Sequence, residues 1–295
     1  MEMKKELLRQ IPKIDEILAK PQATQAVAQG RKAGMTQAAR QAAERLRSRI
    51  LAGETPELSA EATAALALEI AEENSRMNLR PVINGTGVVL HTNLGRACLS
   101  RRAAAGAAAV GGYSTLEYDL ERGARGSRHS HVEQLLCQVT GAEAAMAVNN
   151  NAAAVLLILS ELGRGGEVIT SRGELVEIGG SFRIPDIMVQ CGCTLKEVGT
   201  TNKTHPRDYE RAIGPDTRAL LKVHTSNFKI MGFTESVSLE DMVELGKQYD
   251  LPVVQDLGSG SLVDLERFGI HDEPTVQHSV RAGVDVISFS GDKLL

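Results

Sequence analysis

The chain has 295 residues, of which 42% are hydrophobic and 24% charged, and its formal net charge is −4. This is the composition of a globular protein with one large domain or two smaller ones. No apolar run approaches the roughly 20 residues that a membrane helix requires, and the mixed charges of the first six residues lack a signal-peptide core. We therefore expect a cytoplasmic protein with no membrane segment.

Residues 1–78 are predicted to form a helical N-terminal domain without strands. Apolar residues recur at three- and four-residue spacing from Leu7 to Leu18, and again along one face of 36–51. Strong helix formers fill 57–77. Residues 1–50 hold eleven Lys or Arg against five acidic residues. That bias suits a polyanionic partner, and it suits a solvated helical face equally well.

Residues 79–295 are predicted to form an α/β domain, because short Val/Ile-rich runs alternate there with helical patterns. The expected strands are 145–148, 167–170, 194–198, 219–223, 252–255 and 284–289. The expected helices are 151–162, 180–190, 206–213, 239–249 and 275–282. Continuously apolar strands indicate a mostly parallel sheet covered on both faces. Ligands in such folds bind at the carboxyl ends of the strands.

Two residues at predicted strand ends carry the chemistry. Asp256 closes one apolar strand, and Lys293 follows the next in the run Ser290-Gly291-Asp292-Lys293. A lysine that forms a Schiff base and an aspartate that pairs with a pyridinium nitrogen are what a pyridoxal phosphate site needs. A lone lysine after a strand is more often an ordinary surface residue, so the pairing with Asp256 carries the interpretation.

Further segments are candidates for binding anions. Asn149, Asn150 and Asn151 join a strand to a helix whose first-turn amides could bind the cofactor phosphate, with Ser290 as a second donor. An Asn run can also be a plain helix cap. Arg125 and Arg128 lie in a glycine-broken loop that suits oxyanions, and a solvated loop is the competing interpretation.

The four cysteines do not predict a metal site. Cys191-Gly192-Cys193 has no second ligand pair at zinc-site spacing. Small buried hydrophobic residues between a helix and a strand are the simpler expectation for this pair.

Long segments of the chain resemble one family. They are Arg80–Arg96, Glu117–Arg128, Val148–Ala154, Val223–Ile230 and Ser288–Lys293. All five resemble bacterial selenocysteine synthase, the L-seryl-tRNA(Sec) selenium transferase family. The opening run Leu8–Leu18 is also similar to that family's N-terminal signature, so the resemblance extends from about residue 7 to the end.

The resemblance implies a fold-type I pyridoxal phosphate-dependent transferase large domain preceded by a helical N-terminal domain. Lys293 matches the family's Schiff-base lysine, Asp256 the partner of the ring nitrogen, and Asn227 an asparagine that contacts the ring hydroxyl. The positions that match its phosphate contacts are Ser290, Asn149, Asn150 and Asn151. No residue of 171–182 offers an obvious aromatic partner for the ring.

The implied reaction converts seryl-tRNA(Sec) to selenocysteyl-tRNA(Sec) with selenophosphate, through a pyridoxal phosphate aldimine and an aminoacrylyl-tRNA intermediate. Arg96, Arg125 and Arg128 are candidates for holding selenophosphate or the acceptor end of the tRNA. The helical domain would help to select the selenocysteine tRNA. Because active sites of this fold usually lie at a dimer interface, a homo-oligomer of at least two chains is implied.

Two other functions stay open on the sequence. One is a related pyridoxal phosphate lyase acting on a small amino acid or amino sugar, and the other is a non-catalytic tRNA-binding fragment. The family continues well beyond its lysine, so we expect a truncated chain without the C-terminal small domain. The strand at 284–289 and the strand at 145–148 would then face a gap, leaving unpaired edges and exposed apolar surface.

Overall fold

A computed structural model describes residues 2–178 and 182–294. The chain divides into two compact units, Met1–Ile83 and Asn84–Leu295, whereas the expected division followed residue 78. Within the described ranges no helix is both long and apolar enough to cross a membrane.

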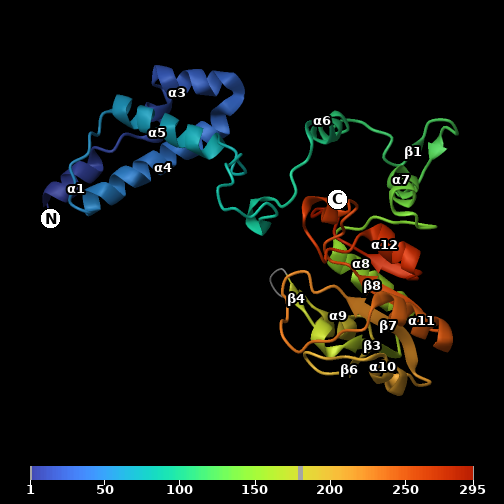
Figure 1. Ribbon diagram of the computed structural model, residues 1–295. Coiled ribbons are helices and arrows are strands. Elements are labelled where there is room, and N and C mark those ends of the chain that lie inside the picture. The colour runs from blue at the N-terminus through green and yellow to red at the C-terminus, as the bar shows by residue number, and fades with distance from the viewer. Residues whose placement is uncertain (1, 179–181, 295) are drawn as a thin grey trace. The chain divides into compact units, whose positions relative to one another are not determined.

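The described part of the N-terminal unit is helical (Figure 1): α1 (Glu2–Arg9), α2 (Ile14–Leu18), α3 (Pro21–Ala26), a π-helical turn (Val27–Arg31), α4 (Lys32–Leu51) and α5 (Ala60–Ser75). Pro21 stands in the first turn of α3, where its missing N–H costs nothing. Ser59 caps α5 by accepting the Ala62 N–H at 3.1 Å. The core is rich in alanine, which lets α4 and α5 pack closely; its alanines include Ala38, Ala39, Ala42, Ala64 and Ala67.

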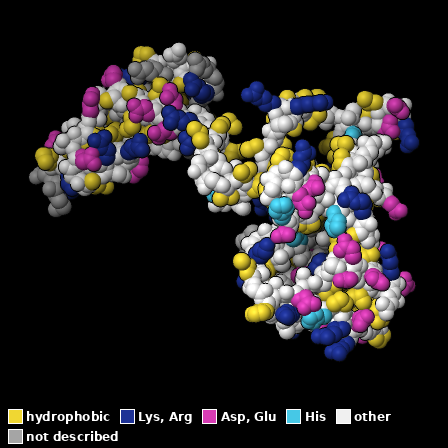
Figure 2. All heavy atoms as spheres, in the orientation of Figure 1, with side chains coloured by type: hydrophobic (Ala, Val, Ile, Leu, Met, Phe, Trp, Pro, Cys, Tyr) yellow, Lys and Arg dark blue, Asp and Glu magenta, His cyan; other side chains and the backbone are white. Residues whose placement is uncertain are grey.

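The second unit begins with small elements: a 3-10 turn (Thr92–Leu94), α6 (Arg101–Ala109), the antiparallel pair β1 (Tyr118–Asp119) and β2 (Ala124–Arg125), and α7 (Ser130–Thr140). Large apolar side chains stay exposed along 88–120, and hydrophobic atoms gather at the surface around α6 in Figure 2. We call this the 88–120 apolar surface. Its exposed members are Val88, Val89, Leu94, Leu99, Val110, Tyr113, Leu116, Tyr118 and Leu120.

A five-stranded parallel sheet forms the rest of the unit. Its strands are β3 (Glu167–Ser171), β6 (Thr194–Val198), β7 (Thr217–Val223), β8 (Val253–Asp256) and β9 (Val286–Ser288), in the order β6-β3-β7-β8-β9. A short antiparallel pair, β4 (Glu177–Ile178) and β5 (Phe182–Arg183), stands apart from it. The expected mostly parallel sheet is confirmed.

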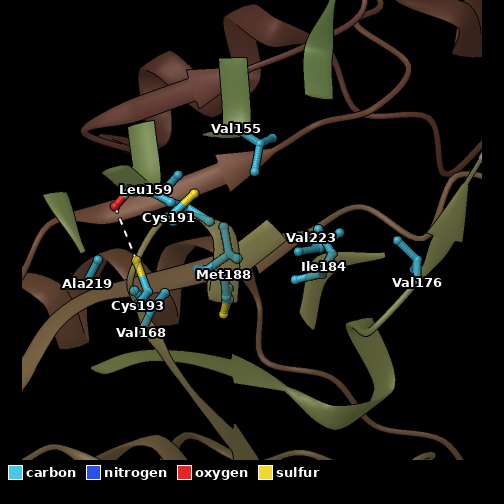
Figure 3. Packing of buried hydrophobic residues seen from close by; sticks show 12 residues of the cluster. Val155, Leu159, Val168, Val176, Ile184, Met188, Cys191, Cys193, Ala219 and Val223 are labelled. Atoms are coloured by element: carbon cyan, nitrogen blue, oxygen red, sulfur yellow. Dashed lines mark hydrogen bonds between the residues drawn. The ribbon is translucent and has the colours of Figure 1, made fainter. Parts of the chain in front are cut away.

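Helices cover both faces of the sheet. On one face α8 (Asn151–Leu162) and α9 (Ile184–Gln190) pack against alternate residues of the strands, as Figure 3 shows for Val155, Leu159 and Met188. Cys191 and Cys193 are buried in this cluster, as expected, and the Cys193 Sγ donates to the Leu159 carbonyl at 3.3 Å.

The opposite face is covered by α10 (Pro206–Ala212) and α11 (Leu239–Tyr249), whose buried residues pack against Ile169, Leu220 and Val253. The last helix, α12 (Val276–Ala282), contacts α7, α11 and β9. The two faces carry different residues of the same strands because side chains alternate along a strand.

Two expected elements are wrong. Ala145–Val148 forms no strand, and its apolar residues Met146 and Val148 are exposed. A strand requires a partner for its backbone groups, and among the described residues none lies beside this segment. The helix expected at 180–190 begins only at Ile184, because Pro185 fits only a first turn and 182–183 pair with β4; residues 179–181 lie outside the described ranges.

Candidate active site

The carboxyl ends of three neighbouring strands meet where the sequence places the chemistry. The register pairs Val223 of β7 with Asp256 of β8, and Asp256 with Ser288 of β9. Paired residues of parallel strands project from the same face, here the face covered by α8 and α9. Asp256 therefore lies at the sheet's carboxyl edge, beside the N-terminus of α8.

Asp256 is a buried carboxylate with few donors. Its residue is 2% exposed, and its Oδ1 accepts the Asn151 Nδ2 at 2.7 Å and the Gly258 N–H at 3.3 Å. Burial raises the pKa of Asp256, and the Asn151 hydrogen bond opposes that rise more than the positive charges of Lys293 and His224 do. Both recorded bonds go to Oδ1, so Oδ2 is left for a further donor in the described structure.

The three asparagines before and within α8 make different contacts. Asn150 is the N-cap, and its Oδ1 accepts the Ala153 N–H at 2.9 Å. Asn151 reaches Asp256, as described above, and its Oδ1 is buried with no partner in the part of the chain that the structure describes. Asn149 is exposed. The side chains of the run therefore do not converge on one point, and the Ala153 and Ala154 N–H groups of the first turn are both bonded to Asn150.

Lys293 lies beyond β9 and is partly buried. Burial lowers the pKa of its ammonium, and the nearby Arg96 guanidinium adds to that effect. The Asp292 carboxylate pairs with Arg96 at 2.6 Å, and the Asp292 carbonyl accepts the Ala97 N–H at 3.2 Å. Residues nearly two hundred positions apart thereby fix the backbone next to Lys293.

The loop after Asp256 supports the segment that carries Ser290 and Lys293. The Leu257 N–H donates to the Ser288 carbonyl at 2.8 Å, and the Leu294 N–H to the Ser259 carbonyl at 3.3 Å. Gly260 has φ +67°, and a Cβ there would meet Phe289 Cδ2 at 2.7 Å and the Ser290 carbonyl oxygen at 2.9 Å. Ser290 is itself buried, at 8% exposure.

Asn227 and His224 follow β7 but point to different partners. Asn227 is exposed, and its Nδ2 donates to the Glu177 carbonyl at 3.0 Å, so it is not joined to Asp256. His224 is closer to the site: its Nδ1 lies 3.0 Å from the Leu257 carbonyl, and its charge acts on Asp256. Sequence reasoning did not select His224, although its place directly after a buried strand was a usable signal.

The arginine candidates are held by carboxylates. Arg125 and Arg128 both pair with Glu117, and together they lower the pKa of that carboxyl, with Arg128 contributing most. All three belong to the loop around β1 and β2, whereas Arg96 pairs with Asp292 beside Lys293. Of the three candidate arginines, Arg96 is therefore the one joined to the strand-end residues.

These residues fit the cofactor that the sequence predicts. A Schiff base with the aldehyde of pyridoxal phosphate forms from a neutral amine, and the environment of Lys293 favours its neutral form. The ring nitrogen of the cofactor needs a carboxylate oxygen that accepts its hydrogen bond, and the Oδ2 of the buried Asp256 is available for that bond. Ser288 Oγ, on the strand beside Asp256, is also buried and has no hydrogen-bond partner within residues 2–178 and 182–294, so this edge of the sheet retains polar atoms without hydrogen bonds.

Comparisons with known proteins place the chain in a family. The family model SelA, described as L-seryl-tRNA selenium transferase, matches residues 82–295. The chain is 51% identical over 291 residues to the L-seryl-tRNA(Sec) selenium transferase of Caldanaerobacter subterraneus subsp. tengcongensis, and 55% identical over 293 residues to that of Geobacter sulfurreducens. Each match covers 98% of this chain, and the chain spans 63% of the length of each relative.

A solved structure gives the same result for the fold. The structure of D-glucosaminate-6-phosphate ammonia-lyase superimposes with a TM-score of 0.53 at 20% sequence identity, over 69% of this chain and 52% of the other. At that identity the likeness concerns the fold alone, which confirms the expected fold-type I large domain. With the family model covering the whole of that domain, the chain belongs to the L-seryl-tRNA selenium transferase family.

Proposed function

We propose that the protein converts seryl-tRNA(Sec) to selenocysteyl-tRNA(Sec), with pyridoxal phosphate bound at Lys293. The activity is a proposal for the whole protein, because the chain spans 63% of the length of each relative. The observation that carries the proposal is the arrangement of an amine of lowered pKa and a buried carboxylate at the ends of adjacent strands, within the family's matched range. The runner-up lyase is less favoured, because the curated relatives are named as selenium transferases.

Each residue has a role that follows from its surroundings. Pyridoxal phosphate, when bound, supplies an electron sink for the carbanion formed at the seryl Cα. Lys293 would hold it through Nζ and, once released, would take the Cα proton and later return one. Asp256 Oδ2 would accept a hydrogen bond from the protonated ring nitrogen. Asn149, Asn150 and Ser290 would contact the phosphate, whereas the amide of Asn151 is engaged by Asp256. Asn227 would contact the ring hydroxyl after its amide leaves the Glu177 carbonyl.

The arginines would supply the positive charge that selenophosphate and the phosphates of the tRNA require. The seryl carboxylate is esterified to tRNA, so an arginine is not needed to hold it and can bind phosphate instead. Arg96, beside Lys293, is our candidate for selenophosphate. Arg125 and Arg128 are more than half exposed and could exchange Glu117 for a selenophosphate or a phosphate of the tRNA acceptor end.

The remaining partners are proposed from surfaces. The helical unit, with eleven basic residues in its first fifty, is our candidate for contacting the selenocysteine tRNA. The 88–120 apolar surface exposes nine large apolar side chains, and exposed apolar surface often marks an interface, so we propose that it is covered in a homo-oligomer of at least two chains. A tRNA substrate indicates a cytoplasmic reaction.

Covalent labelling tests the proposal directly. The chain is incubated with pyridoxal phosphate and reduced with borohydride, and its peptides are mapped by mass spectrometry beside Lys293→Ala. We expect the label on the peptide that contains Lys293 and its loss in the variant. A folded parent chain that takes label elsewhere, or none, would overturn the assignment of Lys293. A gel shift with selenocysteine tRNA, repeated without residues 1–78, tests the helical unit.

A further inference from the structure

The side chain of Asn151 makes a contact that its helix does not need. Asn150 already caps α8, since its Oδ1 accepts the Ala153 N–H at 2.9 Å. Asn151 is the first helical residue, and its amide instead reaches Asp256, 105 positions further along the chain, at 2.7 Å. The contact joins the N-terminus of α8 to the carboxyl end of β8.

We propose that Asn151 is a positioning residue for Asp256: its amide keeps the buried carboxylate ionised and turned so that Oδ2 stays available. The proposal deepens the proposed function, on which it rests only for the donor that Oδ2 would meet, namely the protonated ring nitrogen of pyridoxal phosphate. It also assigns Asn151 a different task from the phosphate contact expected from the sequence.

The first argument is that Asp256 has little else to keep it charged. An ionised carboxylate that is 2% exposed loses its hydration, so it needs strong donors in exchange. Two donors reach it in the described structure: Asn151 Nδ2 at 2.7 Å and the Gly258 N–H at 3.3 Å. The second distance lies beyond the usual range, which makes Asn151 the principal donor.

The second argument concerns pH. The charged groups that face Asp256 are Lys293, beyond β9, and His224, beyond β7, whereas α8 brings only the neutral Asn151. Lys293 loses its positive charge as the pH rises, and burial already disfavours that charge. An amide does not titrate, so Asn151 supplies stabilisation that is independent of pH.

The third argument is that stability does not explain an asparagine here. Asn151 Oδ1 is buried and has no hydrogen-bond partner among the described residues, and an unmet acceptor is unfavourable to folding. Asparagine is also a poorer helix former than alanine in the positions after the cap. The residue is therefore best explained by its Nδ2, which has one recorded acceptor, Asp256.

The test is a titration of Asp256 in the full chain without cofactor, read from the ¹³C shift of its carboxyl carbon. We expect Asn151→Ala to raise the pKa of Asp256 by about one unit, a tenfold change equal to ~1.4 kcal/mol. Asn151→Asp places a second carboxyl against Asp256, so the two should share one proton and the upper apparent pKa of the pair should rise further. Asn150→Ala is the matched control. It removes the helix cap next to Asn151 and should leave the titration of Asp256 unchanged.

Either of two results would overturn the proposal. One is an upper apparent pKa of the carboxyl pair in Asn151→Asp that is no higher than the pKa of Asp256 in the parent, which decides the question even if Asn151→Ala does not fold. The other is a shift in Asn150→Ala as large as that in Asn151→Ala, because the effect would then belong to the helix terminus in general. The titration is carried out without cofactor. A failure to label Lys293 with pyridoxal phosphate would therefore refute the proposed function but leave the inferred role of Asn151 intact.

Discussion

Glu174 and Lys222 form a buried ion pair near the strand ends, and its removal should be costly. Glu174, in the 3-10 turn Arg172–Glu174, pairs through Oε1 with Lys222 Nζ at 2.7 Å, and its Oε2 accepts the Val223 N–H at 2.9 Å. The side chains are only 8% and 17% exposed. Glu174→Gln would leave a buried ammonium without a counter-charge, for which losses of ~3–5 kcal/mol are typical. Because glutamine can still accept one bond, we expect about 3 kcal/mol.

The assay is urea unfolding followed by far-UV circular dichroism. Asp272→Asn is the matched control, since the Lys229–Asp272 pair is 3.1 Å long but 73% and 78% exposed, and its loss should change stability by less than ~0.5 kcal/mol. The double variant Glu174→Met/Lys222→Met should recover most of the loss, because no charge remains buried. A Glu174→Gln loss no greater than that of the control would refute the reasoning.

Three further predictions follow from the structure. Burial and then Arg96 lower the pKa of Lys293, so its amine should acetylate at a lower pH than free lysine, and Arg96→Ala should move that pH upward. Competitive labelling read by mass spectrometry checks both expectations. Half-labelling at the pH of free lysine would contradict the lowered pKa. Gly260→Ala should destabilise the chain and weaken pyridoxal phosphate binding, because the new Cβ would meet a backbone oxygen. Gly269→Ala is the control: its φ is +77° but the space around it is open, so it should cost only ~1 kcal/mol of backbone strain. Equal shifts of the thermal midpoint in the two variants would count against the clash at Gly260. Leu159→Ala should lower the free energy of unfolding by ~2–5 kcal/mol, because the side chain is fully buried between α8 and the sheet, and a urea midpoint equal to the parent's would mean that the site collapses fully.

Much of the fold could be predicted from local sequence patterns. The strand at 194–198 and the helices at 151–162 and 239–249 have the predicted bounds, because long apolar periodicity determines which faces can be buried. Ala145–Val148 has the same strand-like composition and yet forms no strand. Composition shows that a segment can pair, whereas a strand exists only where another backbone lies beside it.

The site shows the same division. Asp256 and Lys293 could be selected from the sequence, because a carboxylate and an amine after apolar strands must lie at one edge of a parallel sheet. Three consecutive asparagines could not be told apart, since their composition and propensity are identical. Only the packing of α8 against the sheet decided that Asn150 caps the helix, that Asn151 binds Asp256 and that Asn149 faces solvent, because hydrogen bonds between distant residues depend on where the helix is placed in space.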